Sequence, residues 1–544
     1  MKKKKITRRF FLTISAMTAA GLAMDWKRMS ALAAKMGSRK GYPTVIIGAG
    51  LGGLCCGAYL AKQGIPVTVV ERHNIPGGYA TSFDRLGGKF TFEVSLHGTC
   101  IHNNATARIL GDLGVLDKLQ VIPLPEVYRL KTPDLEIAVP QRDPDAYIQI
   151  LTKKFPREAD GIRGFVEEML EIAAEADHLH RKKGKFFKLL FPLQYRRMWK
   201  VRSKTLADLL NDHVKDSALQ NILASLWGYY GLPPSKLSGF YYAVATGDYL
   251  KNGSYYIRER SQDLSYALAD VIERHGGKIF YDTPAEKILV ENGAVKGVRL
   301  SGGKVLPARA VVSNGSAPAT FNQLLPIGAV PAEYRKKLES YRPSVSTFLV
   351  WLGLNREIKD RTDGSGYFVG TGRHPDADYE SMLKGEIEMG PFGVAIYDHF
   401  IEGYSRPGTS TLMLIFLCGY EPWRRFESDY RAGQKGAYNR EKARWTDILI
   451  RRAEASVIPG LSSMIEIAEA ATPLTNWRFT GNTEGAIYGF EQSMNNAYMN
   501  RIDNRTPVKG LYLAGAWGKP GGGYTGVLRS GEMTFEMMMA DWGK

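Results

Sequence analysis

The sequence predicts an α/β fold in which one parallel-sheet domain is assembled from separated segments, with an α+β domain inserted between them. Near the start, Val45-Ile46-Ile47 is typical of a buried parallel strand and leads directly into a glycine-rich turn at 48–53. Near the end, a second strand at 511–515 precedes another glycine-rich turn and a helix that begins near Val527. At 544 residues the chain should divide into two or three domains.

The first segment has the order of strand, glycine turn, helix, strand and acid that a dinucleotide requires. Gly48 permits the tight turn, Gly50 lets the backbone approach a pyrophosphate, and Gly53 lets the helix lie close to the strand. The next strand ends on Glu71, whose carboxylate can accept hydrogen bonds from the adenosine ribose. The turn therefore predicts a Rossmann-type dinucleotide-binding domain, with a glycine turn of another α/β protein as the alternative. The residues of this turn that we expect to contact the dinucleotide are Gly48, Gly50, Gly52 and Gly53.

A glycine doublet follows the acid and distinguishes two classes of cofactor. Gly77 and Gly78 let a second piece of backbone approach the same ligand, which a long, buried FAD needs and a nicotinamide cofactor does not. The pattern resembles the glycine-doublet flavoproteins, which include amine oxidases and the phytoene desaturase family. Those proteins often carry a basic residue after the doublet, where this chain has Tyr79. Arg72 and Tyr79 are the further FAD contacts expected here.

The closing segment is expected to return to the same cofactor. The turn at 520–526 leads into a helix whose first backbone N–H groups can face the flavin pyrimidine ring or the ribityl chain. The resembling family often has an acidic residue at the position of Ala516. The FAD contacts expected outside the first segment are Ala285, Asn314, Gly515, Ala516, Tyr524, Thr525 and Val527.

The chain is expected to consist of six segments. The FAD-binding domain comprises 43–104, 251–318 and 481–544, with a mainly helical substrate- or membrane-facing insertion at 105–250, a substrate domain at 319–480 and a signal peptide at 1–35. Helices are expected at 54–63, 110–121, 143–155, 161–180, 206–227, 265–275 and 440–457. Strands are expected at 65–70, 278–281, 286–290, 295–300, 305–312, 345–353, 393–397 and 411–418, with few strand signals in 105–250.

Residues 1–35 resemble a twin-arginine export signal. Basic residues surround Arg8-Arg9, a modestly apolar stretch covers 10–24, and Ala31-Leu32-Ala33 offers a small-residue cleavage site. Twin-arginine export moves folded proteins, which suits a protein that must acquire FAD before it crosses the membrane. We therefore expect the twin-arginine export machinery as a partner and a periplasmic location. A disordered basic tail is the alternative.

The charge distribution points to a membrane surface rather than to nucleic acid. The net charge is +17, of which residues 1–36 contribute +8, and no nucleic-acid module is apparent. No stretch reaches the ~18 apolar residues of a membrane span, so contact would be peripheral. The run 181–204 contains no acidic residue and alternates bases with Phe186, Phe187, Phe191 and Trp199, which suits a helix on an anionic bilayer. A solvated lid is the alternative for this run, and solubility alone is the alternative for the charge.

From residue 44 to the C-terminus the plan resembles the phytoene desaturase family, especially its carotenoid isomerase and retinol saturase branch. The matching stretches are 48–53, 71–82, 254–268 with His275-Gly276-Gly277, 472–475, 481–489 and 511–531. The chain departs from the family at Tyr79, at Ala516 and at Glu259-Arg260, where the family commonly shows a glycine pair. The resemblance implies FAD-dependent hydride transfer on a long apolar polyene or isoprenoid substrate, by desaturation, saturation or isomerisation. The electron donor or acceptor is unknown.

Flavin N5 takes or gives the hydride in such chemistry, and the protein contributes proximity and exclusion of water. The candidates for the flavin-facing wall, and so for catalysis, are His97, Trp517 and Tyr524. The four cysteines form no ligand motif, and no metal site is expected. One rival is a flavin amine oxidase, because 523–526 also resembles that group's closing motif. The other is a non-catalytic flavoprotein scaffold, which the departures at Ala516 and Glu259-Arg260 suggest.

Overall fold

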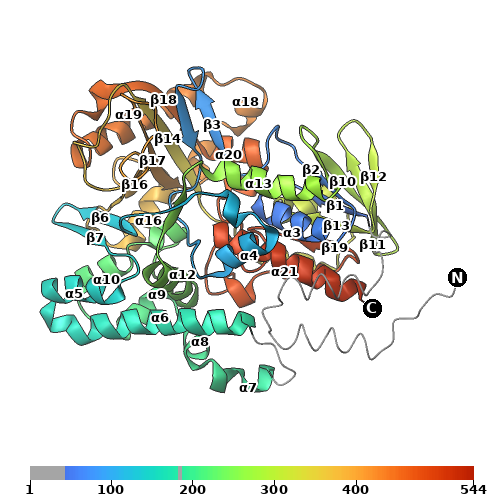
Figure 1. Cartoon of the computed structure of the whole chain (residues 1–544), viewed down its shortest axis with the longest axis horizontal. Coiled ribbons are helices and arrows are strands. Elements are labelled where there is room, and N and C mark those ends of the chain that lie inside the picture. Colours follow the sequence, from blue (N-terminus) through green and yellow to red (C-terminus); the bar gives the residue numbers. More distant parts are fainter. Residues whose placement is uncertain (1–42, 182–186, 544) are drawn as a thin grey trace.

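The computed structural model describes residues 43–181 and 187–543, so the expected export signal at 1–35 lies outside the described residues. Figure 1 shows a five-stranded sheet with its helices at one end of the molecule and a seven-stranded sheet at the other. A layer of helices lies beneath the seven-stranded sheet (Figure 1). The predicted α/β class, with one domain built from separated segments, is confirmed.

The five-stranded sheet is parallel throughout and is assembled from three distant stretches of chain. Its strands, in spatial order, are β19 (Leu511–Leu513), β13 (Ala310–Ser313), β1 (Thr44–Ile47), β2 (Val67–Val70) and β9 (Lys278–Phe280). All four residues of β1 are buried, as the apolar run predicts for a central parallel strand. The ends of β1 and β19 therefore open at the same edge of the sheet.

Helices cover one face of this sheet, and a small antiparallel sheet covers the other. The helices are α3 (Leu51–Lys62), α13 (Ser261–Arg274) and α21 (Tyr524–Trp542). The small sheet comprises β10 (Ala285–Glu291), β11 (Ala294–Leu300) and β12 (Val305–Pro307). Gly531 brings α21 against α3, because a side chain there would overlap the carbonyl oxygen of Gly52. The first and last helices of the described chain are thus in direct contact.

The second domain is built on a mixed seven-stranded sheet. In spatial order its strands are β18 (Ile465–Ala471), β14 (Ser346–Leu354), β17 (Ser410–Cys418), β16 (Phe392–Ile396), β15 (Gly366–Val369), β6 (Tyr128–Thr132) and β7 (Leu135–Val139). The helix α19 (Gly436–Ser456), which buries one face against the core, and the shorter α16 (Pro375–Lys384) and α20 (Pro473–Thr480) accompany it. A hairpin of β3 (Ser82–Arg85) and β4 (Phe90–Glu93) joins the two domains.

The stretch 105–250 is mainly helical, but it contains three strands that the sequence pattern does not predict. β6 and β7 extend the seven-stranded sheet, and β5 (Val121–Pro123) pairs with β8 (Tyr255–Ile257). β7 is the edge strand of the sheet and β6 lies next to it, and both include charged residues, so neither has the continuous apolar run of a central strand. The helices of this stretch are α4 (Ala105–Leu113), α5 (Pro144–Lys154), α6 (Ala159–Arg181), α7 (Phe187–Gln194), α8 (Arg196–Val201), α9 (Leu206–Asn211), α10 (Ser217–Leu223), α11 (Trp227–Tyr230) and α12 (Gly239–Asn252).

Three predicted elements have different bounds for local reasons. The helix expected at 110–121 ends early, because Gly114 adopts a left-handed conformation with φ of 69°. The helix expected at 206–227 is divided, since Asp216 caps a new helix at α10. The strand expected at 305–312 is two strands, β12 and β13, which belong to different sheets and separate after Pro307.

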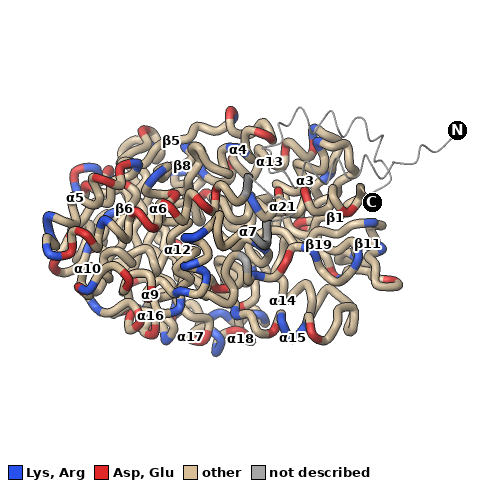
Figure 2. Tube along the Cα trace, turned by 90° about the horizontal axis from the view of Figure 1, so that it is seen from below, with Lys and Arg blue, Asp and Glu red and all other residues tan. Residues whose placement is uncertain are grey.

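Acidic and basic residues are interspersed over the outer elements rather than gathered on one side (Figure 2). Among the described residues, none of the helices combines the length and apolar character needed to cross a membrane.

Candidate active site

The turn after β1 has the geometry that its glycines predict. Gly48 has φ of 94°, and its N–H donates to the carbonyl oxygen of Val70 on β2 across 2.8 Å. A side chain at Gly53 would overlap the carbonyl oxygen of Gly48, so the first turn of α3 lies directly against the loop. The N-terminal N–H groups of α3 therefore open toward the carboxyl edge of the sheet, where an anion is stabilised.

The glycine doublet forms a second piece of backbone beside this turn. The Gly77 N–H donates to the carbonyl oxygen of Ala49 across 2.8 Å, and Gly50 and Gly77 form an isolated parallel bridge. Gly78 has φ of 64°, and a side chain there would point at the Gly50 Cα. The turn after β1 and the glycine doublet together form one continuous backbone surface, as expected for a cofactor that two segments of the chain contact.

Glu71 fixes the conformation of the glycine turn after β1. Its carboxylate accepts hydrogen bonds from the backbone N–H groups of Ala49, at 2.6 Å, and His73, at 2.8 Å. Burial raises the pKa of Glu71 above its ordinary value, and these two hydrogen bonds offset part of that increase. Each carboxylate oxygen keeps a further acceptor site, so the ribose contact expected of Glu71 is compatible with this loop-fixing role.

The closing segment meets the first one at a close backbone approach. Gly515 has φ of 84°, and a side chain at Gly52 would lie 2.6 Å from the Gly515 Cα. Asn314, which follows β13, sits beside both, and a side chain at Gly50 would come within 2.7 Å of the Asn314 Nδ2. The carboxyl ends of β1, β13 and β19 therefore converge on a single site.

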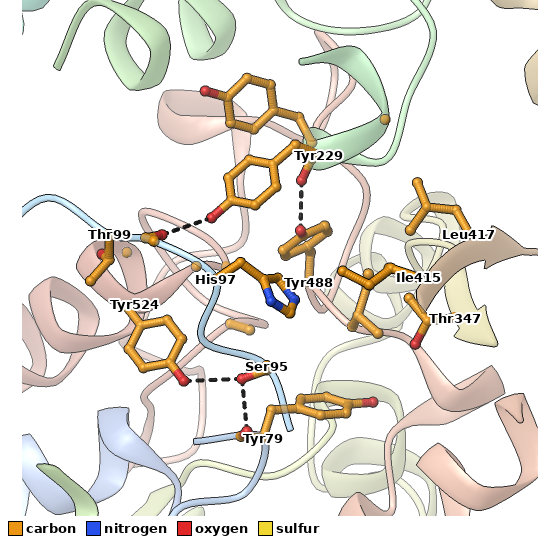
Figure 3. Close-up of a pocket in the computed structure, with 18 of the residues that line it drawn as sticks. Tyr79, Ser95, His97, Thr99, Tyr229, Thr347, Ile415, Leu417, Tyr488 and Tyr524 are labelled. Atoms are coloured by element: carbon orange, nitrogen blue, oxygen red, sulfur yellow. Dashed lines mark hydrogen bonds between the residues drawn. The ribbon is translucent and has the colours of Figure 1, made fainter. Parts of the chain in front are cut away.

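Tyr524 begins α21 and connects the closing segment to the glycine doublet. Its hydroxyl lies 3.0 Å from the Ser95 Oγ, which donates to the carbonyl oxygen of Tyr79 across 2.7 Å (Figure 3). Thr525 hydrogen-bonds the Thr106 hydroxyl on α4 at 2.8 Å. The start of α21 is thereby tied to the segment that follows the doublet and to α4, which packs with α3 and α21.

One continuous cavity of about 1640 Å³ passes over these loops and on into the second domain. Every residue predicted to contact FAD lines it except Gly53, whose role is the packing of α3. The predicted residues that line it are Gly48, Gly50, Gly52, Glu71, Arg72, Gly77, Gly78, Tyr79, Ala285, Asn314, Gly515, Ala516, Tyr524, Thr525 and Val527. Typical ligand pockets have volumes of about 300–1,000 Å³, so this cavity can accommodate a dinucleotide and a second ligand together.

The three catalytic candidates take different positions. The His97 ring lies in the cavity, with its Nδ1 3.1 Å from the Tyr397 hydroxyl, and burial lowers the pKa of His97 to about 4 (Figure 3). Tyr524 also faces the cavity (Figure 3). Trp517 borders the cavity, but its Nε1–H donates to Asn482 at 3.0 Å and its ring packs edge-on against Phe490. Trp517 is therefore an anchored wall residue.

Beyond His97 the cavity becomes an aromatic and aliphatic chamber. Tyr229 and Tyr249 come from the helical layer, Tyr488 comes from the closing segment, and Ile415 and Leu417 come from β17. Figure 3 shows Tyr229, Tyr488, Ile415 and Leu417 around the His97 ring. The Tyr488 hydroxyl donates to the carbonyl oxygen of Tyr229 across 2.6 Å. The chamber therefore presents rings and aliphatic groups to a ligand, with its tyrosine hydroxyls engaged by the protein.

Two buried charged groups organise the site without lining the cavity, and sequence reasoning missed both. Glu93 accepts hydrogen bonds from the backbone N–H groups of Val94, Ser95 and Leu96, and from Ser261, which fixes the approach to His97. Burial raises the pKa of Glu93. Arg501 donates to the carbonyl oxygen of Ala516 across 2.6 Å. Neither lies in a recognisable motif, because the Ser261 partner of Glu93 is 168 positions away and Arg501 donates to backbone carbonyl oxygens, which carry no sequence signal.

The departures from the expected motifs have structural counterparts. Tyr79 directs its hydroxyl to the carbonyl oxygens of Gly485 and Ala486, at 3.3 Å each, in place of an ionic contact. Arg260 has φ of 82°, which explains a glycine at that position in the resembling family. Its guanidinium stacks 3.9 Å above the Tyr404 ring and donates to the Tyr404 carbonyl oxygen, which holds the unfavourable backbone conformation.

Comparison with known proteins gives consistent results. Residues 51–428 match the family model of flavin-containing amine oxidoreductases. The chain is 26% identical to prolycopene isomerase of Daucus carota, over 96% of this chain and 84% of that one. It is 25% identical to all-trans-retinol 13,14-reductase of Danio rerio, over 87% and 82% of the two chains.

Solved structures share the fold. An oxidoreductase from Methanosarcina mazei aligns over 91% of this chain and all of its own, with a TM-score of 0.59 and 19% identity. Putrescine oxidase bound to putrescine aligns over 92% and 99%, with a TM-score of 0.59 and 16% identity. The glycine loops, Glu71 and the start of α21 fit the FAD that the sequence predicts. The chain belongs to the family of flavin-containing amine oxidoreductases and is an FAD-dependent oxidoreductase.

Proposed function

We propose that this protein catalyses a flavin-dependent reaction of a long apolar polyene or isoprenoid, as a desaturation, a saturation or an isomerisation. The observation that carries the proposal is the single cavity of about 1640 Å³ that joins the dinucleotide-binding loops to the chamber of Tyr229, Tyr488, Ile415 and Leu417. A long apolar chain suits such a chamber, because each methylene removed from water contributes about 0.8 kcal/mol. The likeness to relatives named for prolycopene and retinol supports the same substrate class.

FAD would be held by the glycines of the β1–α3 turn, the doublet, Glu71 and the start of α21, and it supplies hydride transfer when bound. The protein's own residues position the two reactants. Tyr524, Ser95 and Tyr79 form a hydrogen-bonded chain that fixes the cavity wall nearest the doublet. The chamber residues exclude water and align the polyene, which lowers the barrier by proximity rather than by acid–base chemistry.

The test compares substrates on the FAD-loaded protein. Purified protein is extracted with organic solvent to identify bound lipid, and then mixed anaerobically with all-trans-retinol, prolycopene or putrescine, once with the flavin oxidised and once with the flavin chemically reduced, because saturation consumes two electrons. Consumption or isomerisation of a polyene, followed by chromatography together with the flavin spectrum, supports the proposal. Reaction with putrescine alone would favour the amine oxidase alternative, and reaction with none of the three would favour a non-catalytic flavoprotein.

A matched pair of variants locates the substrate. Ile415→Glu places a charge in the chamber, away from the FAD loops, and should abolish polyene turnover while the flavin absorbance is retained. Val305→Glu introduces the same charge at an exposed position on β12 and should change neither property.

We further propose that the protein is exported in folded form by the twin-arginine route to the periplasm, and that it touches the membrane peripherally. Arg8-Arg9 and the small-residue site at 31–33 support export. On the described part of the run 181–204, Leu193 and Trp199 are 72% and 42% exposed, which supports insertion into a bilayer surface. An electron donor or acceptor of unknown identity would complete the redox cycle.

The charge of this run contributes less to the membrane proposal than its sequence suggests. Arg197 pairs with Glu171 at 2.6 Å, and Lys200 lies 3.6 Å from Glu168. The run 181–204 contains no acidic residue, but these acids on α6 neutralise part of its positive charge. The cavity reaches α6 at Ala174, which is exposed. Because α8 is paired with α6 through the same ion pairs, we place the delivery of an insoluble substrate at α7–α8.

A further inference from the structure

His97 presents a fixed hydrogen-bond acceptor to the cavity. The Tyr397 hydroxyl lies 3.1 Å from the His97 Nδ1 and 3.0 Å from the Leu96 carbonyl oxygen, to which it donates. A hydroxyl has one proton, and a carbonyl oxygen can only accept. Both contacts are satisfied when Tyr397 donates to Leu96 and the His97 Nδ1–H donates to Tyr397. The other ring nitrogen, Nε2, then carries a lone pair.

His97 lines the cavity and uses Nδ1 for its contact with Tyr397, which leaves the Nε2 lone pair available to a ligand. Figure 3 shows the His97 ring in the cavity between Tyr488 and the β17 residue Ile415. Within the part of the chain that the structure describes, His97 makes one hydrogen bond, through Nδ1 with the Tyr397 hydroxyl. Burial holds the pKa of His97 at about 4, so the ring is neutral near pH 7.

The neighbouring hydroxyls point their protons at the protein. Ser95 donates to the Tyr79 carbonyl oxygen, and Tyr524 is then the donor in its contact with Ser95 (Figure 3). The Tyr488 hydroxyl donates to the carbonyl oxygen of Tyr229. The Tyr229 and Tyr249 hydroxyls lie 3.1 and 3.2 Å from the Gly98 carbonyl oxygen. His97 therefore offers a free acceptor among groups whose donors are already committed.

We propose that the His97 Nε2 accepts a hydrogen bond from a hydroxyl group of the substrate, so that the substrate class is a polyene alcohol rather than a polyene hydrocarbon. This inference rests on the proposed function and narrows it. A hydrocarbon would exclude water from the chamber and leave the Nε2 lone pair without a hydrogen-bond donor. A substrate hydroxyl donates to Nε2, so both the acceptor and the donor are satisfied. The expected preference for the alcohol is about 10- to 100-fold in affinity.

Tyr397 acts as a positioning residue in this arrangement. Without its hydroxyl, His97 is free to place its proton on Nε2, which then donates instead of accepting. A Tyr397→Phe variant should therefore lose part of the alcohol preference, although Tyr397 is separated from the substrate by the His97 ring.

The experiment measures binding to the FAD-loaded protein, using all-trans-retinol and its O-methyl ether, which has the same polyene without a hydroxyl proton. Affinities are obtained anaerobically from the perturbation of the flavin absorbance. The parent protein should bind the alcohol about 10- to 100-fold more tightly. His97→Phe should abolish the preference and Tyr397→Phe should reduce it, while Tyr512→Phe, whose hydroxyl contacts Asp541 instead, should keep it.

The outcomes separate this inference from the proposed function. Equal affinity of the parent protein for the two ligands overturns the role of His97 and leaves the polyene proposal standing. Failure to bind either ligand overturns the assignment of a polyene alcohol, and the reaction with prolycopene then decides separately whether the proposed function stands. A preference that survives in His97→Phe overturns the inference, and a shifted flavin spectrum in that variant would then show that Nε2 faces the cofactor. If His97→Phe does not fold, the affinities of the parent protein and of Tyr397→Phe still decide whether the preference for the alcohol depends on His97.

Discussion

The Arg501 guanidinium donates to the Ala516 carbonyl oxygen across 2.6 Å, which ties a fully buried cation to the loop that follows β19. The same guanidinium donates to the carbonyl oxygens of Tyr488 and Phe490, at 3.0 and 2.9 Å. No ion pair to Arg501 occurs within the described part of the chain. Burial lowers the pKa of Arg501 to about 10, so it remains charged at neutral pH. Arg501 holds together the closing segment that borders the FAD site.

Replacing Arg501 should therefore loosen the closing loop. Arg501→Gln leaves buried carbonyl oxygens without donors, at about 1 kcal/mol or more each, so we expect at least ~3 kcal/mol of lost stability and a lower flavin content. Chemical denaturation and the ratio of flavin to protein absorbance measure the two effects. Arg505→Gln is the control, because its ion pair with Asp541 is exposed and worth about 1 kcal/mol at most. Equal effects of the two variants would contradict the role assigned to Arg501.

The packing of α3 on the first loop gives a second prediction. Gly53→Ala should force α3 away from Gly48 and remove most of the bound FAD, because the added carbon would overlap a backbone carbonyl group that cannot rotate away. Gly111→Ala makes the same substitution within α4, where nothing lies within 4 Å, and should leave the flavin content unchanged or slightly raise stability. The yellow absorbance of each purified variant is the readout. A fully yellow Gly53→Ala protein would exclude the assigned packing role.

His97 predicts a pH dependence of stability. The pKa of His97 is lowered from 6.5 to about 4 in the folded state, so the unfolded state binds more protons between these values. Stability should therefore fall as the pH decreases from about 6.5 to 4, by about 3 kcal/mol at most from this group. Urea denaturation between pH 4.5 and 7.5 should show a shallower slope for His97→Gln than for the parent. Ile327→Gln, at an exposed residue without an ionisable group, is the control and should keep the parental slope.

The parts of the site that could be predicted from sequence are those encoded by local backbone requirements. Gly48, Gly53 and Gly515 are recognisable because a tight turn or close approach demands glycine at a fixed spacing from a strand. Glu71 is recognisable because it ends the second strand of the same unit. These signals need no knowledge of distant segments.

The parts that could not be predicted depend on contacts between distant segments. Glu93 is an unremarkable strand-terminal acid until Ser261, 168 positions away, donates to it. Likewise, the 181–204 run contains bases without acids, and only the folded chain shows that Glu168 and Glu171 lie beside them. Pairing of β6 with β15 likewise joins segments more than two hundred residues apart, which no local pattern encodes.

The export proposal is tested at its arginine pair. Changing Arg8 and Arg9 to Lys keeps the charge but removes the paired guanidinium groups, so the protein should remain in the cytoplasm with FAD bound. Cell fractionation followed by flavin absorbance of each fraction measures this. Changing Lys3 and Lys4 to Arg in the same region is the control and should not alter export. Normal periplasmic recovery of the arginine variant would rule out the twin-arginine route.

The last prediction concerns delivery of an insoluble substrate through α7–α8. Leu193 and Trp199 are exposed on neighbouring helices of the protrusion that Figure 1 shows below α6, and both can enter the acyl boundary of a bilayer. Leu193→Glu with Trp199→Glu should reduce sedimentation with anionic vesicles and slow turnover of vesicle-borne polyene. Turnover of detergent-solubilised polyene should stay unchanged, because neither residue lines the cavity.

The matched control for this pair is Ile327→Glu with Met389→Glu, which adds the same two negative charges at exposed apolar residues far from α7–α8 in the chain. It should leave vesicle binding and both turnover rates at parental levels. If the α7–α8 variant and this control bind vesicles equally, the helix pair is a solvated lid. A loss of vesicle turnover without a loss of binding would instead mean that the two side chains guide the substrate after docking, and the membrane contact would have to lie on another surface.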